Sequence, residues 1–455
     1  MLHKFYIQLL VLVMVSCYAT DIKADDNTLI PSTGQKVYVL ITATSVKAKL
    51  MVSNYGRNAI HDFDYTLSFN ENILASKHYT LPEDLNHNDG TTIEIDVPPH
   101  TELSETNLIF TITKVNGDRN NATFNYATLP RVTVNKVPKR RVVVEDYTAM
   151  WCGYCPRGIA IMENLAKKYP EDFVGIAVHA GDRRDTYADD FIGIVIHSSD
   201  PLRCQDYDAK AYEDRSRPSL WMNRNRKLAY YIAREEFESE RSAGADMDVD
   251  VTAVWDEQKN NITVTPSVTF CVNKEEAPYG FTYVLTEDGM SDPSWVQSNN
   301  FSQDTNELGI SKELDEFIRA SFNVRNLVNN FVAIAAEGVG KPLMGYIKAP
   351  IKADQTQSHS YVFKNVSSKP IIRDKAKLKV CVLLINTQTG RIENAAKCSI
   401  ADAIPNSISS VSDRKETAVE TARYTLDGRK ITAPQKGINI VKYSDGRVRK
   451  EVITQ

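Results

Sequence analysis

The sequence Cys152-Gly153-Tyr154-Cys155 constrains the fold of this chain more than any other feature. It lies between residues 141–147, a valine-rich run typical of a buried strand, and residues 158–169, whose apolar positions fall mainly on one face of a helix. At a strand-to-helix junction the pair meets the helix N-terminus, where unpaired N–H groups and the helix dipole favour a thiolate. We therefore predict that Cys152 is the more exposed and more acidic nucleophile and that Cys155 resolves the mixed disulfide.

Two other interpretations of the cysteine pair are a static disulfide and a metal site. A tetrahedral zinc site needs a second ligand pair at suitable spacing, and neither the other cysteines nor the eight histidines supply one. We therefore expect no metal and no other cofactor. The strand-to-helix context favours a redox-active pair over a static disulfide.

The chain begins with residues 1–19, which are typical of a secretory signal peptide. A basic start precedes an apolar run over residues 5–15, and cleavage after Ala19 fits best because Cys17 and Ala19 are small at the −3 and −1 sites. Cleavage after Ala24 and lipidation of Cys17 are the alternatives. No later apolar run approaches the ~18 residues that span a bilayer. We expect an exported protein that is secreted or held at the outer membrane surface, with the periplasm as the alternative, and whose cysteines can be oxidised.

The length of 455 residues allows about three domains. Residues 30–137 carry short alternating runs that indicate an N-terminal β-sandwich-like domain. Residues 138–242 alternate strands with helices, as in an α/β domain, and residues 243–404 return to strands in a second β-rich domain. Residues 405–455 combine a serine-rich linker, residues 406–412, with a small β segment of about three strands. The net charge of −4 does not suggest nucleic-acid binding.

Within the α/β region, residues 173–179 predict a second buried strand, and residues 185–198 and 205–214 predict helices. Pro218 precedes a further strand. His179 ends a predicted parallel strand, where functional sites gather. A single histidine at such a position is more often a structural hydrogen-bond partner, so we do not assign it a catalytic role.

A separate prediction concerns the pairing of the cysteines outside the motif. A hairpin turning at residues 386–391 makes Cys398 a diagonal neighbour of Cys381, and a small bulge would bring the two directly opposite. We predict a Cys381–Cys398 disulfide, with Cys271 as the rival partner of either cysteine and Cys204 unpaired. The alternative is that all four are small buried apolar side chains.

Four features resemble the thioredoxin superfamily: the Cys-x-x-Cys pair, Asp146 six residues before it, Trp151 directly before it, and Pro218 ahead of a strand. The resemblance implies that Asp146 lies buried beneath the disulfide and handles the proton of the second cysteine. It also implies that Pro218 follows a cis peptide bond and faces the disulfide, with the backbone of Arg217 presented to the substrate.

The residues between the two cysteines add a second resemblance. Exported disulfide isomerases of the Dsb type often carry the same Gly153-Tyr154 pair between their cysteines. Pro156, directly after the motif, departs from thioredoxin itself, although proline is tolerated in a first helical turn.

Residues 144–158, with Arg217-Pro218-Ser219 and Asn223-Arg224, resemble the outer membrane protein 28 family of Bacteroidetes. That family combines a thioredoxin-like region with β-rich flanks, has no well-defined activity, and has been suggested to act as an adhesin or receptor. Residues 426–429 and 436–440 resemble a type IX secretion sorting tail, which implies translocation across the outer membrane.

These patterns predict a thioredoxin-like α/β domain between two β-sandwich-like domains, followed by a small C-terminal β segment. The function expected is an exported thiol–disulfide oxidoreductase, a reductase or isomerase, whose partners are protein thiols or disulfides. Cys152, Cys155 and Asp146 would be catalytic, and the substrate groove would be formed by Trp151, Gly153, Tyr154, Arg217 and Pro218. The alternative is a cell-surface adhesin or binding protein that uses the same scaffold and binds its ligand through the β domains.

Overall fold

The computed structural model describes residues 26–179, 200–211, 216–402, 420–425, 429–443 and 448–453. The expected signal peptide, the expected helix over residues 185–198 and the expected linker at residues 406–412 lie outside these ranges. The chain divides into two compact units, Met1–Ala403 and Ile404–Gln455. The first unit is mostly β-stranded and contains several sheets.

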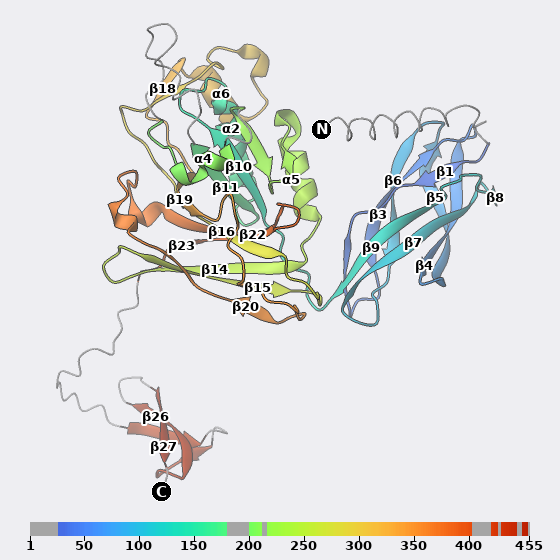
Figure 1. Ribbon diagram of the computed structural model, residues 1–455. Helices are drawn as coiled ribbons and strands as arrows, with labels where there is room; N and C mark the ends of the chain where they lie inside the picture. Colours follow the sequence, from blue (N-terminus) through green and yellow to red (C-terminus); the bar gives the residue numbers. More distant parts are fainter. Residues whose placement is uncertain are drawn as a thin grey trace, which may run out of the picture. The chain divides into compact units, whose positions relative to one another are not determined.

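Two sheets form the N-terminal part of the first unit (Figure 1). Their strands are β1 Leu29–Pro31, β2 Val37–Leu40, β3 Val46–Asn54, β4 Ile60–Phe69, β5 Asn72–Leu85, β6 Gly90–Val97, β7 Ser104–Val115, β8 Asp118–Arg119 and β9 Tyr126–Val134. One sheet has the order β1-β3-β6, and the other has the order β2-β9-β7-β4-β5 with β8 paired to β7. Alternate residues of β6 and β7, such as Ile93, Ile95, Phe110 and Ile112, enter one apolar cluster. The period of two therefore buries one face of each sheet.

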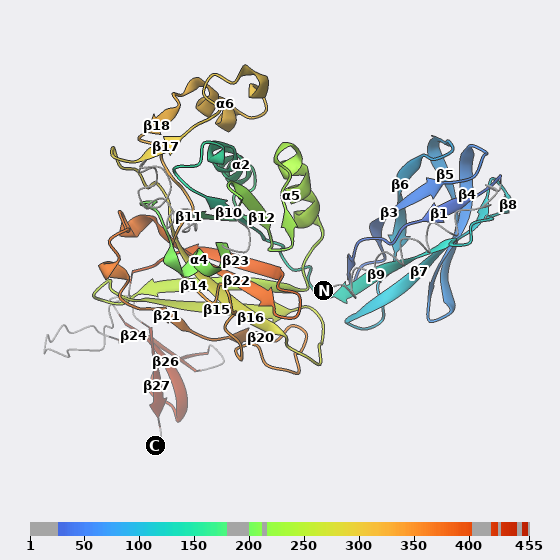
Figure 2. The ribbon, with the colours of Figure 1, turned by 45° about the horizontal axis from the view of Figure 1, so that its top comes forward.

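An eight-stranded sheet carries the cysteine motif (Figures 1 and 2). Its strands are β10 Val142–Thr148, β11 Phe173–His179, β12 Ser219–Met222, β13 Arg226–Lys227, β16 Tyr279–Glu287, β19 Val332–Glu337, β22 Leu378–Asn386 and β23 Ile392–Ser399. Their order is β13-β12-β10-β11-β19-β16-β22-β23. The predicted boundary between residues 242 and 243 therefore does not coincide with an edge of this sheet, because later strands extend it beyond β11.

One face of the sheet is covered at the β10 end by helices. These are α2 Cys155–Lys168 and α5 Ala233–Ser242. Val142 and Val144 of β10 pack against Met162 of α2 and Phe237 of α5 in one buried cluster. All seven residues of β10 are buried, as expected for a central strand of a covered sheet.

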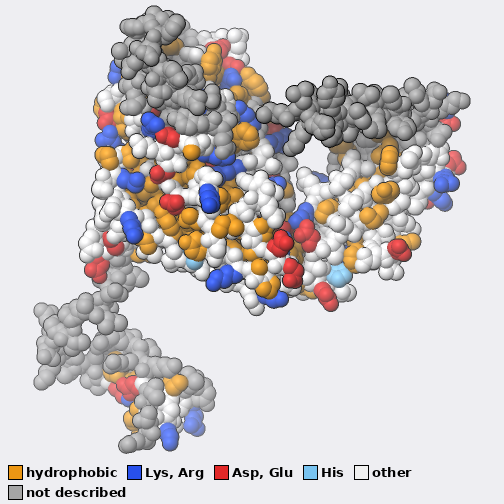
Figure 3. Space-filling model, in the orientation of Figure 1, with side chains coloured by type: hydrophobic (Ala, Val, Ile, Leu, Met, Phe, Trp, Pro, Cys, Tyr) orange, Lys and Arg blue, Asp and Glu red, His pale blue; other side chains and the backbone are white. Residues whose placement is uncertain are grey.

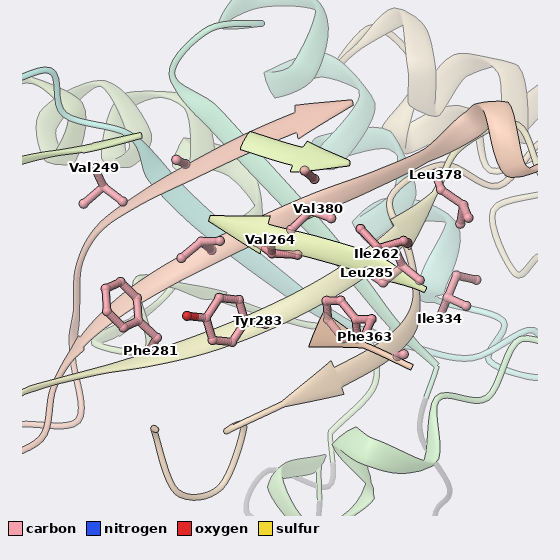
Figure 4. Close-up of a cluster of buried hydrophobic side chains, with 14 of the residues drawn as sticks. Val249, Ile262, Val264, Phe281, Tyr283, Leu285, Ile334, Phe363, Leu378 and Val380 are labelled. Atoms are coloured by element: carbon pink, nitrogen blue, oxygen red, sulfur yellow. The ribbon is translucent and has the colours of Figure 1, made fainter. Parts of the chain in front are cut away.

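The same face at the β16 end is covered by a second sheet. Its strands are β14 Met247–Trp255, β15 Ile262–Phe270, β20 Thr356–Ser358 and β21 Tyr361–Phe363. Figure 4 shows the apolar core between the two sheets, where Val264 and Phe363 lie near Tyr283, Leu285 and Val380. The sandwich predicted for this region thus shares its second layer with the sheet that carries the cysteine motif.

On the opposite face of the eight-stranded sheet, strands from distant parts of the same sheet pack against each other. Val143 and Tyr147 of β10 belong to the same buried cluster as Leu383 of β22 and Ala395 of β23. Strand pairing places all four side chains on one face of the sheet. The sheet therefore curls so that β22 and β23 pack against β10, which its continuous twist allows.

A long excursion, residues 288–331, separates β16 from β19. Its elements are β17 Val296–Ser298, η3 Thr305–Glu307, α6 Lys312–Arg319 and β18 Asn323–Arg325. Figure 2 shows β17, β18 and α6 beside α2. Phe301 and Leu314 of the excursion pack against Ala160 of α2. A segment predicted to belong to the second β domain therefore contacts the motif helix.

Short 3-10 and α-helical turns connect several strands of the first unit. They are η1 Gln205–Tyr207, α4 Asp208–Ala211, η2 Tyr230–Ile232, η4 Val366–Ser368 and η5 Lys375–Lys377. In the described part of the chain, no helix combines the length and apolar character that a membrane span needs. On the face in Figure 3, acidic and basic side chains are interspersed with apolar ones.

The second unit is a four-stranded antiparallel sheet. Its strands are β24 Glu420–Thr425, β25 Lys430–Ile431, β26 Gly437–Tyr443 and β27 Val448–Ile453, in the order β25-β24-β26-β27. Val441 is fully buried, and the guanidinium of Arg423 pairs with Glu420 and Glu451 at 2.8 Å each. The sequence predicted three strands, and the additional short strand β25 pairs with β24.

The predicted Cys381–Cys398 disulfide is wrong. The hairpin closes as expected, with Asn386 donating to the carbonyl of Arg391, but Cys381 pairs with Lys397 and Cys398 pairs with Val380. A register shift of one residue turns a side chain to the other face of a sheet. The two thiols therefore lie on opposite faces, and both are free, as are Cys204 and Cys271.

Candidate functional site

Cys152 and Cys155 form a disulfide at the start of α2, with their Cα atoms 5.3 Å apart. The helix begins at Cys155, three residues before its predicted start, with Pro156 in its first turn. That turn contains no acidic residue, so the dipole at the helix N-terminus is not offset there. Cys152 is 6% exposed and Cys155 is 0% exposed. The order of exposure is the predicted one, although both residues are buried.

Asp146 lies beneath this turn on β10 and is 1% exposed. A Cβ atom built on Gly158 of α2 would come within 2.6 Å of Asp146 Oδ2, so the carboxyl group packs directly against the helix. Burial raises the pKa of this carboxyl to about 7, against opposing effects of the nearby His179 and Arg217. A carboxyl group with this pKa can gain or lose a proton near neutral pH.

The other predicted groove residues lie in two segments, residues 151–154 of the motif and residues 217–218 before β12. Trp151 packs with Cys152 and Cys155, whereas Tyr154 is 60% exposed and touches the ring of Phe301 edge-on. The Arg217–Pro218 peptide bond is cis, as predicted. The carbonyl of Pro218 accepts a hydrogen bond from the Tyr230 hydroxyl at 2.8 Å.

The excursion binds the backbone of the motif loop, which the sequence did not predict. Gln297 donates its side-chain amide to the carbonyl of Cys152 at 3.0 Å, and the Ser298 N–H donates to the carbonyl of Met150 at 2.8 Å. The Asn300 N–H donates to the carbonyl of Gly153 at 2.8 Å. These contacts join residues about 145 positions apart in sequence, so no local pattern could have indicated them.

His179 and Asp200 form a buried pair beside Asp146. His179 Nδ1 lies 3.0 Å from Asp200 Oδ2, which confirms the interpretation of His179 as a hydrogen-bond partner. Asp200 also accepts hydrogen bonds from the N–H groups of Met150 at 2.8 Å and Leu202 at 3.0 Å. Burial would raise the pKa of Asp200, but His179 and these N–H groups outweigh it and hold the pKa below its ordinary value. Asp200 thereby ties the motif loop to the end of β11.

Glu145, the neighbour of Asp146, faces the opposite side of the sheet. Its carboxylate receives two hydrogen bonds from the guanidinium of Arg224, at 2.7 and 2.8 Å, and one from the Tyr207 hydroxyl at 2.9 Å. Glu145 and Tyr207 are fully buried. This network holds β10 on the face of the sheet that lies opposite α2, whereas Asp146 lies on the face that α2 covers.

The described residues contain no group of three or more His, Cys, Asp or Glu side chains placed to hold a metal ion. The fold and site define a multidomain, mostly β-stranded protein with a disulfide at a helix N-terminus beside a buried carboxyl group. The chain matches no protein-family model. No curated protein matches it either.

Solved structures with some likeness include two from Porphyromonas gingivalis. HBP35 is 15% identical, covering 70% of this chain and 99% of its own, with a TM-score of 0.35. A domain of the outer membrane lipoprotein Omp28 is 10% identical, covering 35% of this chain and 90% of its own, with a TM-score of 0.18. The CARDB domain of PF1109 from Pyrococcus furiosus is 16% identical, covering 25% of this chain and 99% of its own, with a TM-score of 0.20.

Proposed function

We propose that this protein is a thiol–disulfide oxidoreductase with a thioredoxin-like centre at Cys152 and Cys155. Two observations support the proposal: the disulfide ends on Cys155, the first residue of α2, and Gly158 in the first turns of the same helix packs against the buried carboxyl group of Asp146. The helix N-terminus stabilises a thiolate, and a carboxyl group with a pKa of about 7 can accept the proton of the second thiol.

The arrangement of strands supports a thioredoxin-like domain. β13, β12, β10 and β11 lie side by side in that order, with β10 and β11 parallel and β12 antiparallel to β10. The motif follows the central strand β10, and the loop with Arg217 and Pro218 leads into β12. This is the order of elements in the thioredoxin fold. The later strands β19, β16, β22 and β23 extend the same sheet beyond β11.

The reaction proceeds in two exchanges. In the reduced protein, the Cys152 thiolate attacks a substrate disulfide, forms a mixed disulfide and releases one substrate thiolate. Asp146 then takes the proton of Cys155, whose thiolate attacks the Cys152 sulfur and displaces the second substrate thiolate. Two electrons pass from the cysteine pair to the substrate, and the reverse sequence oxidises a dithiol.

The substrates proposed are extracytoplasmic proteins, because the first 19 residues resemble a signal peptide and the C-terminal segment resembles a sorting tail. Trp151, Gly153, Tyr154, Arg217 and Pro218 would contact the substrate chain. We place the protein outside the cytoplasm, at the outer membrane surface or released from it.

The test is the reduction potential of the pair together with insulin reduction. The parent protein should equilibrate with a glutathione buffer and reduce insulin, and Cys152→Ser should abolish both. Cys155→Ser should instead accumulate a mixed disulfide, and Cys398→Ser should behave like the parent because that thiol lies in β23. A parent protein whose disulfide resists reduction and which leaves insulin oxidised would defeat the proposal.

A surface binding protein is the second candidate. The observation that favours it is the 6% exposure of Cys152, which limits access to a substrate disulfide. On this hypothesis the disulfide stabilises the loop, and the β-rich regions carry the binding surface. Cys152→Ser would then lower stability without removing any exchange activity.

A further inference from the structure

A small cavity separates Asp146 from His179 at the ends of β10 and β11. Its volume is about 20 Å³, and it is lined by Asp146 and Thr148 of β10, His179 of β11, Glu163 of α2 and Asn330 of the excursion. A cavity above roughly 10–15 Å³ with two or more polar partners can hold one water molecule. The cavity therefore has the size and polarity of a single-water site.

Two of the residues that line the cavity have buried polar atoms that lack a hydrogen-bond partner among the described residues. Among the described residues, Asp146 Oδ1 and Thr148 Oγ1 are buried and have no hydrogen-bond partner. Residues 146 and 148 share one face of β10, and strand pairing puts His179 next to Thr148 on that same face. Buried polar atoms without a partner are costly, and one shared water would satisfy both.

We propose that a water held between Asp146, Thr148 and His179 passes the proton of Asp146 to the His179–Asp200 pair. This inference rests on the oxidoreductase proposal and adds the route by which the proton leaves Asp146. Asp146 takes a proton from Cys155 and donates it to the water, which donates one to His179. The imidazolium that forms is stabilised by the Asp200 carboxylate at 3.0 Å, so charge and protons balance.

The charges around this path favour transfer toward His179. His179 and Arg217 both act on Asp146 by lowering its pKa, which opposes burial and promotes release of the proton. Glu163, on the α2 wall of the cavity, accepts a hydrogen bond from Asn330 at 2.7 Å. Asp200 is held as a carboxylate by two backbone N–H groups and His179. His179 is thus a positioning and relay residue behind Asp146.

The first measurement needs no redox activity. The ¹³C carboxyl signal of Asp146, assigned with Asp146→Asn, is titrated in the oxidised full chain and in His179→Gln. The Asp146 midpoint should move upward in the variant, because the proton of Asp146 can no longer pass to residue 179. Thr148→Val, which removes the hydroxyl, should alter the titration, while the matched variant Thr148→Ser should preserve it. Identical curves in parent, His179→Gln and Thr148→Val would overturn the relay.

The second measurement follows exchange with dithiodipyridine in the reduced protein. His179→Gln and Thr148→Val should slow the attack by Cys155 roughly tenfold near pH 7 and leave the attack by Cys152 unchanged. Equal rates for Cys155 in parent and variants would overturn the relay. A parent protein with no exchange would remove the oxidoreductase proposal, and the water link would then be decided by the carboxyl titration alone. Near-UV circular dichroism of each variant separates these effects from unfolding.

Discussion

Asn300 lies against Gly153 so closely that a Cβ atom on Gly153 would come within 2.2 Å of the Asn300 side-chain oxygen. The Asn300 N–H also donates to the Gly153 carbonyl at 2.8 Å. The excursion between β16 and β19 thus holds the loop between the two cysteines by its backbone and covers it with a side chain. A segment far away in sequence therefore holds the loop between the two cysteines.

Gly153→Ala should destabilise the protein by about 1 kcal/mol, because the Asn300 side chain must move to admit the methyl group. Asn300→Ala should remove most of that cost, so the two changes should couple in a double-mutant cycle measured by urea unfolding. Gly340→Ala is the matched control, since a Cβ there meets no atom within 4 Å. Additive effects of Gly153→Ala and Asn300→Ala would contradict the contact.

Asp146→Asn should stabilise the oxidised protein more at pH 8 than at pH 5. Folding raises the pKa of Asp146 from 3.8 to about 7, so the folded protein binds the carboxyl proton more tightly than the unfolded chain does. This difference stabilises the fold fully below pH 4, and the stabilisation is lost as the pH rises through 7. A shift of this size corresponds to a loss on the order of 4 kcal/mol by pH 8. Asp89→Asn, at an exposed turn, is the control for the removal of one carboxyl group. A pH-independent effect of Asp146→Asn would contradict the shift.

Glu145→Gln should destabilise the protein by about 3–5 kcal/mol, because it leaves the guanidinium of Arg224 buried without its counter-charge. Arg224→Met should have a similar cost for the same reason. The double variant should lose less stability than the sum of the two, measured by denaturant unfolding of the oxidised protein. Equal additive losses would show that the pair does not act as a unit.

Cys204, Cys271, Cys381 and Cys398 should all react as free thiols when the protein is unfolded without reductant. In the folded protein Cys204, Cys271 and Cys381 should react slowly, because burial raises the pKa of each thiol to about 12 and removes it from solvent. Cys398, at the edge strand β23, should react faster than Cys381. Mass mapping of alkylated peptides checks both statements, and a Cys381–Cys398 crosslink would contradict the observed register.

The sequence predicted the local part of the site. The valine run before the motif and the helical period after it predicted β10 and α2, because burial on both faces and a period of 3.6 are local patterns. The alternating runs near residues 93 and 110 likewise indicated the N-terminal strands. The cis bond before Pro218 and the burial of Asp146 beneath the helix also agree with expectations taken from the motif.

Only the tertiary structure decided what lies around that centre. Gln297 and Asn300 reach the motif loop because β19 joins the sheet beside β11 and brings the excursion back across α2. The pairing of His179 with Asp200 and the register that separates Cys381 from Cys398 depend equally on long-range packing. A sequence pattern indicates which face of a helix or strand is apolar. Which other element packs against that face depends on the free energy of the whole packed core.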